Sequence, residues 1–299
     1  MNSLIKISYA LKWSGFLSSF LIMASVTSLP ELFVGVGAAF HKYPQLSFGN
    51  IVGANIVNLT LGVSMISLAC GSFAMRAKKD RENVIYTILF SFLPFLLILD
   101  KTLSRIDGLI LLSAAAFYVK KILSEGKTTV HPPFHLKDLK ATPSLKELKS
   151  FLKNVFLFIF SVIILLFSAE AILRLIKSIA FQIGMPLVSA GAVLISLSTA
   201  LPEISFGVRA GIKKRPDLAW GNISGTVIIN SAFVLGIVAV IYPIKIVNAQ
   251  PYITIAAFAL LASFSLLLFR ESGRGISRKE ALFLFFVYTA FVLAQVLRI

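Results

Sequence analysis

The sequence predicts an all-α polytopic membrane protein whose two halves are inverted-topology repeats of transmembrane helices. Three observations lead to this fold class: the composition, the spacing of apolar segments, and an internal duplication. Of the 299 residues, 57% are hydrophobic and only 14% are charged, too few to cover the surface of a soluble domain. In a bilayer every backbone polar group must be paired internally, so the apolar segments are expected to be helices.

Nine apolar segments bounded by charged or turn-forming residues are the expected membrane spans. They lie at residues 13–39, 49–74, 84–100, 107–123, 152–180, 187–212, 219–241, 251–269 and 281–297. The third contains Pro94 and is short for a span. No cleavable signal peptide is expected, because residues 1–12 are short and mixed in character. The single cysteine, Cys70, excludes a disulfide framework.

The distribution of lysine and arginine predicts how these spans are oriented. If the N-terminus is cytoplasmic, 22 of the 29 basic residues lie on the cytoplasmic side, as the positive-inside rule requires. The outside then holds only Lys42, Lys101, Arg105, Arg174, Lys177, Lys245 and Arg298. We therefore expect an integral protein of the cell membrane with its C-terminus outside. The net charge of +16 is a topology signal, and no basic face for nucleic acid is expected.

A polar segment at residues 124–150 divides the chain into a first half, 1–123, and a second half, 151–299. We expect this segment to be a cytoplasmic linker loop. His131 and His135 lie within it, but two prolines separate them, and the composition favours a solvated linker over a metal site. No cofactor is expected.

The two halves contain the same two motifs, offset by 172 residues. "TSLPE" at 27–31 aligns with "TALPE" at 199–203, and "GNIVGANIVN" at 49–58 aligns without a gap with "GNISGTVIIN" at 221–230. By the predicted topology the opening helix of the first repeat runs outward and its counterpart runs inward, so the halves are inverted. Inverted repeats with interrupted helices are typical of secondary transporters, whose binding sites lie near the membrane midplane where the repeats meet.

The first motif brings polar groups into the middle of an apolar span. Pro30 has no N–H and deprives the carbonyl of Val26 of its helical partner, and Pro202 does the same to Ser198. A carbonyl freed in this way can be satisfied by a bound cation or by water. The hydroxyls of Thr27, Ser28 and Thr199 lie at the same level of the sequence.

The carboxylates of Glu31 and Glu203 are expensive inside hydrocarbon and therefore indicate a cavity or an ion path. Together with the amides of Asn58 and Asn230 they form a hard oxygen set that suits Ca²⁺ or Na⁺. Two carboxylates balance one Ca²⁺ or two Na⁺. Taken alone, the glycines and asparagines of the second motif could serve only helix packing, but the duplication of both motifs at equal spacing favours a binding site.

These paired motifs resemble the two alpha repeats of the sodium/calcium exchangers, in the cation/Ca²⁺ exchanger superfamily. The resemblance covers nearly the whole chain and implies alternating access, with Ca²⁺ exchanged against Na⁺. It implies that Glu31 and Glu203 are the central Ca²⁺ ligands, with Asn58 and Asn230 nearby. It also implies cation contacts from backbone oxygens around Thr27 and Thr199 and from the hydroxyls of Ser28 and Thr226.

The sequence departs from the family pattern at several of these positions. Ala54 and Ala200 stand where the family has serines, Asn230 where the second repeat often has aspartate, and Val227 where asparagine is expected. The coupling ion is therefore left open between Na⁺, H⁺ and K⁺. The family has ten spans, and the residues before Trp13 are too few for the first of them; either the start codon is misplaced or this is a nine-span member.

Four other residues in or near the spans carry smaller predictions. Glu170 and Arg174 are four residues apart and are expected to form an ion pair on one helix. Arg209 is expected to extend toward the cytoplasmic lipid phosphates, although an inward rotamer could pair with Glu203 and block the site. Trp220 is expected to be an interfacial anchor.

The sequence favours a secondary active cation antiporter that exchanges Ca²⁺ for Na⁺ or H⁺. A passive cation channel is disfavoured, because conduction needs a continuous multi-site pore. An intramembrane enzyme is disfavoured, because no nucleophile–base pair, His/Cys cluster or phosphate loop accompanies the glutamates. A transport-inactive homologue remains an alternative. The expected partners are the transported ions and the lipid bilayer, and the oligomeric state is not predicted.

Overall fold

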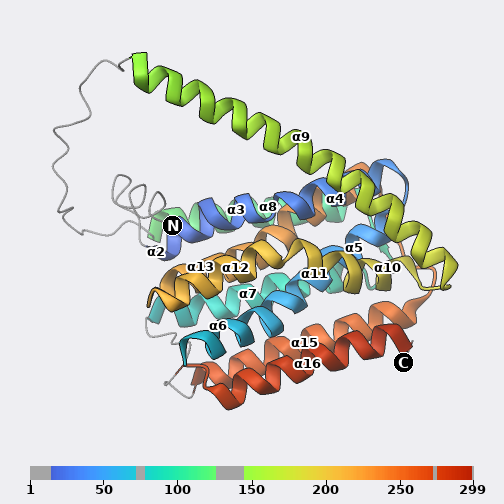
Figure 1. The fold of residues 1–299 in the computed structure, drawn as a ribbon. Coiled ribbons are helices and arrows are strands. Elements are labelled where there is room, and N and C mark those ends of the chain that lie inside the picture. Colours follow the sequence, from blue (N-terminus) through green and yellow to red (C-terminus); the bar gives the residue numbers. More distant parts are fainter. Residues whose placement is uncertain (1–14, 72–77, 126–144, 272–274, 298–299) are drawn as a thin grey trace.

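The computed structural model describes residues 15–71, 78–125, 145–271 and 275–297, which are almost entirely helical. Figure 1 shows the helices as a bundle, with the long α9 crossing at one edge and diverging from the other helices toward its N-terminal end. The all-α prediction is therefore confirmed, and each predicted span coincides with a helix or with a run of consecutive helices.

The first half begins with two interrupted spans and continues with two unbroken helices. The first span comprises α2 (Gly15–Ser18), η1 (Ser19–Met23), α3 (Ala24–Thr27) and α4 (Leu29–Phe40). The second comprises α5 (Pro44–Val57), η2 (Asn58–Gly62) and α6 (Val63–Cys70). The unbroken helices are α7 (Lys78–Leu97) and α8 (Arg105–Glu125).

The second half has the same order after an additional long helix, α9 (Leu145–Gln182). Its first interrupted span comprises α10 (Leu187–Ala190), η4 (Gly191–Ile195), α11 (Ser196–Thr199) and α12 (Leu201–Ile212). Its second comprises α13 (Pro216–Ile228), η5 (Ile229–Val234) and α14 (Leu235–Ile241). The unbroken helices are α15 (Ala249–Glu271) and α16 (Arg278–Leu297). Most of the predicted linker, including His131 and His135, lies outside the described residues.

By length and apolar composition, four helices among the described residues could each cross a membrane, or six spans if each bent pair is counted as one. The bent pairs are the first and sixth predicted spans. The helices α7, α8 and α9 lie at the positions of the remaining three. In α7 the apolar stretch is confined to Asn83–Leu97, which explains why this span is short in the sequence.

Two short strands join the connections that follow α7 and α14. β1 (Thr102–Leu103) and β2 (Ile244–Lys245) pair antiparallel, with Thr102 opposite Lys245. The backbone N–H of Ile246 also donates to the carbonyl of Lys101 at 2.9 Å. Lys101 and Lys245 thus lie at the same end of the bundle, as the alternating topology predicts. Which end faces the cytoplasm stays a prediction.

Both glutamate-bearing spans are bent at the same point of the repeat. The axis turns by 43° between Phe16–Thr27 and Leu29–Phe40, and by 42° between Leu187–Thr199 and Leu201–Ile212. Pro30 and Pro202 lie in the first turn of the helix that follows each bend. A proline is accepted there because the first N–H groups of a helix have no intrahelical partner. The sequence rule for proline therefore locates both breaks.

The glycines of the second motif bring backbones of opposite halves into direct contact. A Cβ atom on Gly49 would lie 1.9 Å from the carbonyl oxygen of Val188, and one on Gly221 would lie 2.6 Å from that of Phe16. Gly53 and Gly225 make the equivalent approaches to the carbonyl oxygens of Ala192 and Phe20. As a result α5 packs on α10 and η4, and α13 packs on α2 and η1.

The pseudo-symmetry also includes structural features that the sequence motifs do not predict. The π-helical turns η1 and η4 occupy positions exchanged by the 172-residue offset, and η2 and η5 carry Asn58 and Asn230. Such turns interrupt the regular α pattern and are common at functional sites. The symmetry mates Ser91 and Ser263 lie with their hydroxyl oxygens 3.4 Å apart, so the pseudo-two-fold axis passes between α7 and α15.

Two predictions about individual side chains have opposite outcomes. The Glu170–Arg174 ion pair is confirmed at 2.7 Å, and His41 contacts the other carboxylate oxygen at 2.8 Å. The interfacial role expected for Trp220 is wrong, because its side chain is 1% exposed and belongs to the core. The start of α13 is covered by α2, so a position near the end of a span is enclosed by the other half.

Substituting Gly49 by alanine should destabilise the protein by about 1–3 kcal/mol, because the new methyl group would overlap the Val188 carbonyl. Gly62 is the matched control, since a Cβ there would meet its nearest neighbours at 3.6 Å, an ordinary contact. Thermal unfolding of the purified proteins in detergent measures both effects. Equal unfolding temperatures for Gly49→Ala and Gly62→Ala would contradict the backbone contact.

Candidate cation site

Two buried carboxylates lie beside each other where the bent spans are broken. Glu31 is in the first turn of α4 and Glu203 is in the first turn of α12, and both side chains are 0% exposed. The Glu31 carboxylate interacts electrostatically with the Glu203 carboxylate and with the Thr199 hydroxyl. The Glu203 carboxylate interacts with the Thr27 hydroxyl. Each carboxylate therefore faces the threonine of the opposite repeat.

These carboxylates have no conventional partners. None of their four oxygens accepts a hydrogen bond of good geometry from the residues that the structure describes, and no lysine or arginine among those residues forms a salt bridge with either group. Two adjacent carboxylates without partners are costly inside an apolar bundle unless a cation or a proton neutralises them. Both lie at helix N-termini, where the helix dipole favours negative charge.

The two threonines are held by asparagines of the opposite repeat. The Thr199 hydroxyl donates to Asn50 Oδ1 at 3.1 Å, and the Thr27 hydroxyl lies 3.4 Å from Asn222 Oδ1. These two contacts are exchanged by the 172-residue offset. A hydroxyl that donates its single hydrogen to an asparagine keeps its lone pairs for another ligand, so each contact leaves a threonine oxygen available to a cation.

The remaining predicted site residues carry buried oxygen atoms without a hydrogen-bond partner among the described residues. These are the hydroxyls of Ser28 and Thr226 and the side-chain amides of Asn58 and Asn230. Each of the four side chains is at most 2% exposed. Their elements contact the broken spans: η2 with Asn58 touches α12, η5 with Asn230 touches α4, and α13 with Thr226 touches α3.

The oxygen set is not symmetric, although the backbone is. Ser28 in the first repeat corresponds to Ala200 in the second, and Thr226 in the second corresponds to Ala54 in the first. Each half therefore contributes one hydroxyl that the other lacks. All four positions are buried, so the two halves differ in hydroxyl content inside the protein and not only on its surface.

Sequence reasoning missed three asparagines of this region. The duplication pairs Asn50 with Asn222, and that pairing was a signal that could have revealed their role. Asn55 corresponds to Val227, so the repeat gives no signal for it. Asn55 is 2% exposed and donates from Nδ2 to the Ser231 hydroxyl at 2.7 Å, which leaves its Oδ1 without a partner among the described residues.

Arg209 does not enter the site. Its side chain is exposed on α12, and no ion pair joins it to Glu203 in the described part of the chain. The blocked arrangement that the sequence left open is therefore not the one observed. The buried carboxylate, amide and hydroxyl oxygens on these contacting elements are of the kinds that Ca²⁺ and Na⁺ prefer as ligands.

Comparison with known proteins agrees with this geometry. A family model described as sodium/calcium exchanger protein matches residues 1–120 and 153–297. The putative antiporter CaxA of Alkalimonas amylolytica is 28% identical over 279 residues, covering 90% of this chain and 84% of that protein. The sodium/calcium exchanger MaX1 of Methanosarcina acetivorans is 24% identical over 311 residues, covering 93% and 88%.

The fold also matches a solved structure. The sodium-calcium exchanger NCX_Mj, in a structure soaked with Na⁺ and Sr²⁺, superposes with a TM-score of 0.71 at 21% identity, covering 97% of this chain and 90% of that chain. At this identity the likeness establishes the all-helical membrane transporter fold.

A double-mutant cycle tests whether Asn50 and Thr199 hold each other. Asn50→Ala and Thr199→Val should each lower the free energy of unfolding. The loss in the double variant should be about 1 kcal/mol smaller than the sum of the two single losses, because both single variants remove the same hydrogen bond. Chemical denaturation in detergent gives the four values. The control pairs Asn50→Ala with Ser67→Ala, about 25 Å away along the same span, and should be additive. Additivity in both cycles would contradict the contact.

Proposed function

The chain belongs to the sodium/calcium exchanger protein family, and we propose that it is a secondary active antiporter that moves Ca²⁺ against Na⁺ or H⁺ by alternating access. The observation that carries this proposal is the pair of buried carboxylates at the breaks of two inverted spans. Such a pair can hold one Ca²⁺ with its charge balanced, or two monovalent cations in its place. Either load neutralises the two carboxylates, so the same site can carry Ca²⁺ in one direction and the monovalent cations in the other, as an antiporter does.

In this proposal Glu31 and Glu203 are the anionic ligands. Ser28 and Thr226 supply hydroxyl oxygens, and Asn58 and Asn230 supply amide oxygens, all from groups that lack other partners among the described residues. Thr27 and Thr199 contribute hydroxyl oxygens that lie within hydrogen-bond distance of Asn222 and Asn50.

Alternating access is supported by the inverted pseudo-symmetry. Each glutamate-bearing helix is broken at the same position and packs against the glycine motif of the opposite half. A structure built from two equivalent, oppositely directed units can adopt two related arrangements in which the shared site opens to either side of the membrane.

Replacing either Glu31 or Glu203 by glutamine should abolish ⁴⁵Ca²⁺ uptake into proteoliposomes that carry an outward Na⁺ or H⁺ gradient, because the site would lose half of its negative charge. Na⁺, H⁺ and K⁺ gradients applied separately identify the coupling ion. Glu170→Gln is the matched control, since this carboxylate is partly exposed on α9 and pairs with Arg174. Gradient-driven uptake that persists in both site variants would refute the proposal. Uptake in the unmodified protein that ignores every gradient would indicate a channel instead, and no uptake at all would indicate an inactive homologue.

The variant Thr226→Val should separate cation binding from stability. Valine has the same shape as threonine, and the Thr226 hydroxyl has no hydrogen-bond partner among the described residues, so thermal stability without Ca²⁺ should be unchanged or higher. The apparent Ca²⁺ affinity in the uptake assay should fall about tenfold, equivalent to about 1.4 kcal/mol.

Thr87→Val is the control for that experiment, because the buried Thr87 hydroxyl contacts the Asn83 carbonyl and the Ser224 hydroxyl at 2.8 and 2.6 Å. It should lower stability and leave the Ca²⁺ affinity unchanged. If both valine variants had the same Ca²⁺ affinity, Thr226 would not be a ligand.

A further inference from the structure

Asn55 forms a buried hydrogen bond between the two halves of the chain. Its Nδ2 donates to the Ser231 hydroxyl at 2.7 Å, and the two side chains are 2% and 0% exposed. Asn55 lies on α5, and Ser231 lies on η5 directly after Asn230. Residues three apart on a helix are neighbours on its surface, so Asn55 also lies next to Asn58. The bond is therefore close to both amides of the candidate cation site.

The turn that carries Asn230 needs support from outside its own helix. η5 is a π-helical turn, which interrupts the regular α-helical hydrogen-bonding pattern. The Asn230 side chain is 0% exposed, and neither its Oδ1 nor its Nδ2 has a hydrogen-bond partner among the described residues. The Asn55–Ser231 bond fixes the next residue along the turn. It thereby fixes the backbone from which the Asn230 amide projects.

The equivalent place in the other repeat has no such bond. The 172-residue offset pairs Asn55 with Val227. It pairs Ser231 with Leu59, and both of these apolar side chains are buried. The turn η2 is instead held within its own half, where the Thr60 hydroxyl donates to the carbonyl oxygen four residues earlier. A side-chain bond to the opposite repeat therefore supports the amide on η5 and not the amide on η2.

Packing alone does not account for this polar pair. An apolar pair fills the equivalent place in the other repeat, so the fold does not require a hydrogen bond here. The polar pair also has a cost, because Asn55 Oδ1 stays buried without a hydrogen-bond partner among the described residues. A cost that the fold does not require indicates that the bond serves the site beside it.

We propose that Asn55 is a positioning residue for cation binding: through Ser231 it holds η5 so that the Asn230 amide is directed toward the Glu31 carboxylate. This role rests on the proposed antiport function. The direction agrees with the packing, because η5 contacts α4, the helix on which Glu31 lies. Asn55 acts on Asn230 and not on Asn58, so the two amides of the site are held in different ways.

The first test measures the apparent Ca²⁺ affinity in the proteoliposome uptake assay. Asn55→Leu should lower this affinity about fivefold to tenfold, as expected for the loss of one hydrogen bond that acts on a ligand. Ser231→Ala removes the other end of the bond and should lower the affinity to the same extent. The exchanged pair, Asn55→Ser with Ser231→Asn, restores a bond between the same two groups and should recover most of the affinity.

Combining these variants with the site amides separates positioning from a general structural effect. In the Ser231→Ala background, Asn230→Ala should have little further effect on the Ca²⁺ affinity, because its amide is already misdirected. Asn58→Ala should lower the affinity by the same factor with and without Ser231→Ala. A general loosening of the bundle would weaken the contributions of both amides alike.

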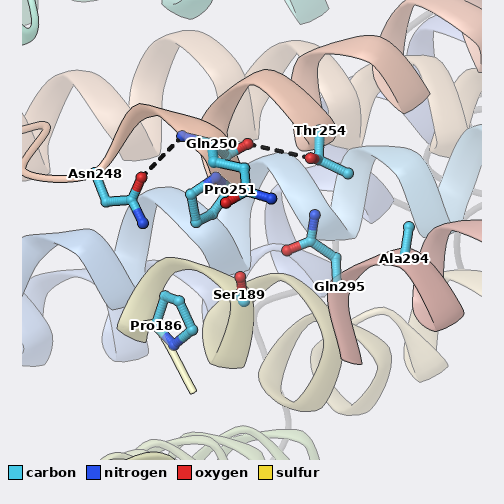
Figure 2. A pocket seen from close by; sticks show the side chains of 8 residues that line it. All are labelled: Pro186, Ser189, Asn248, Gln250, Pro251, Thr254, Ala294 and Gln295. Atoms are coloured by element: carbon cyan, nitrogen blue, oxygen red, sulfur yellow. Dashed lines mark hydrogen bonds between the residues drawn. The ribbon is translucent and has the colours of Figure 1, made fainter. Parts of the chain in front are cut away.

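Gln295→Leu is the matched control, because it also replaces a buried amide by leucine, but far from the carboxylates. Gln295 is 3% exposed and lines a hollow at the ends of α10, α15 and α16 (Figure 2). Ser189, in the same lining, precedes Thr199 by ten residues along one interrupted span, a distance of about 15 Å at the helical rise. Gln295→Leu should therefore leave the Ca²⁺ affinity unchanged.

The possible failures are distinguishable. If the unmodified protein transports Ca²⁺ and both Asn55→Leu and Ser231→Ala keep its affinity, the positioning role is overturned and the antiport proposal stands. Equal losses from Asn230→Ala with and without Ser231→Ala would also overturn it. No gradient-driven uptake by the unmodified protein would refute the proposed function, and the positioning role with it. Should Asn55→Leu not fold, Ser231→Ala, which removes a single oxygen atom, carries the test.

Discussion

The structure depends on the burial of two carboxylates next to each other in an apolar bundle. Glu31 and Glu203 repel each other, receive no well-formed hydrogen bond from the described residues, and lie where water is scarce. An arrangement this unfavourable persists only if the rest of the bundle enforces it and if a positive charge relieves it. The bends, the π-helical turns and the backbone contacts at the glycines all hold the two helix breaks against each other.

The two halves complete each other and do not form separate half-sites. The threonine of each repeat contacts the asparagine of the other, and the broken helix of each packs on the glycine motif of the other. The hydroxyls follow the same principle, since Ser28 has no counterpart at Ala200 and Thr226 has none at Ala54. Neither half alone would contain two carboxylates or this set of oxygens.

The sequence predicted most of the fold, because apolar length and proline are local signals and the duplicated motifs align without a gap. It located the ends of the helices to within about seven residues and both helix breaks at the prolines. It failed where tertiary packing decides: Trp220 is enclosed by α2, which no property of α13 alone reveals. Asn55 has no asparagine at the equivalent position of the second repeat, where Val227 stands, so only its packing against Ser231 reveals it. Those arrangements arise from distances between segments far apart in the chain.

The glycine contacts have a consequence for which parts of the molecule can shift together. Because the α5 backbone touches that of α10 and η4 without intervening side chains, these elements cannot slide past one another without steric collision. The same holds for α13 with α2 and η1. The contacts therefore join segments of both halves into two composite units, and the bends at Ser28 and Ala200 lie where each broken span leaves its unit. The boundary between these two units therefore does not coincide with the boundary between the two repeats.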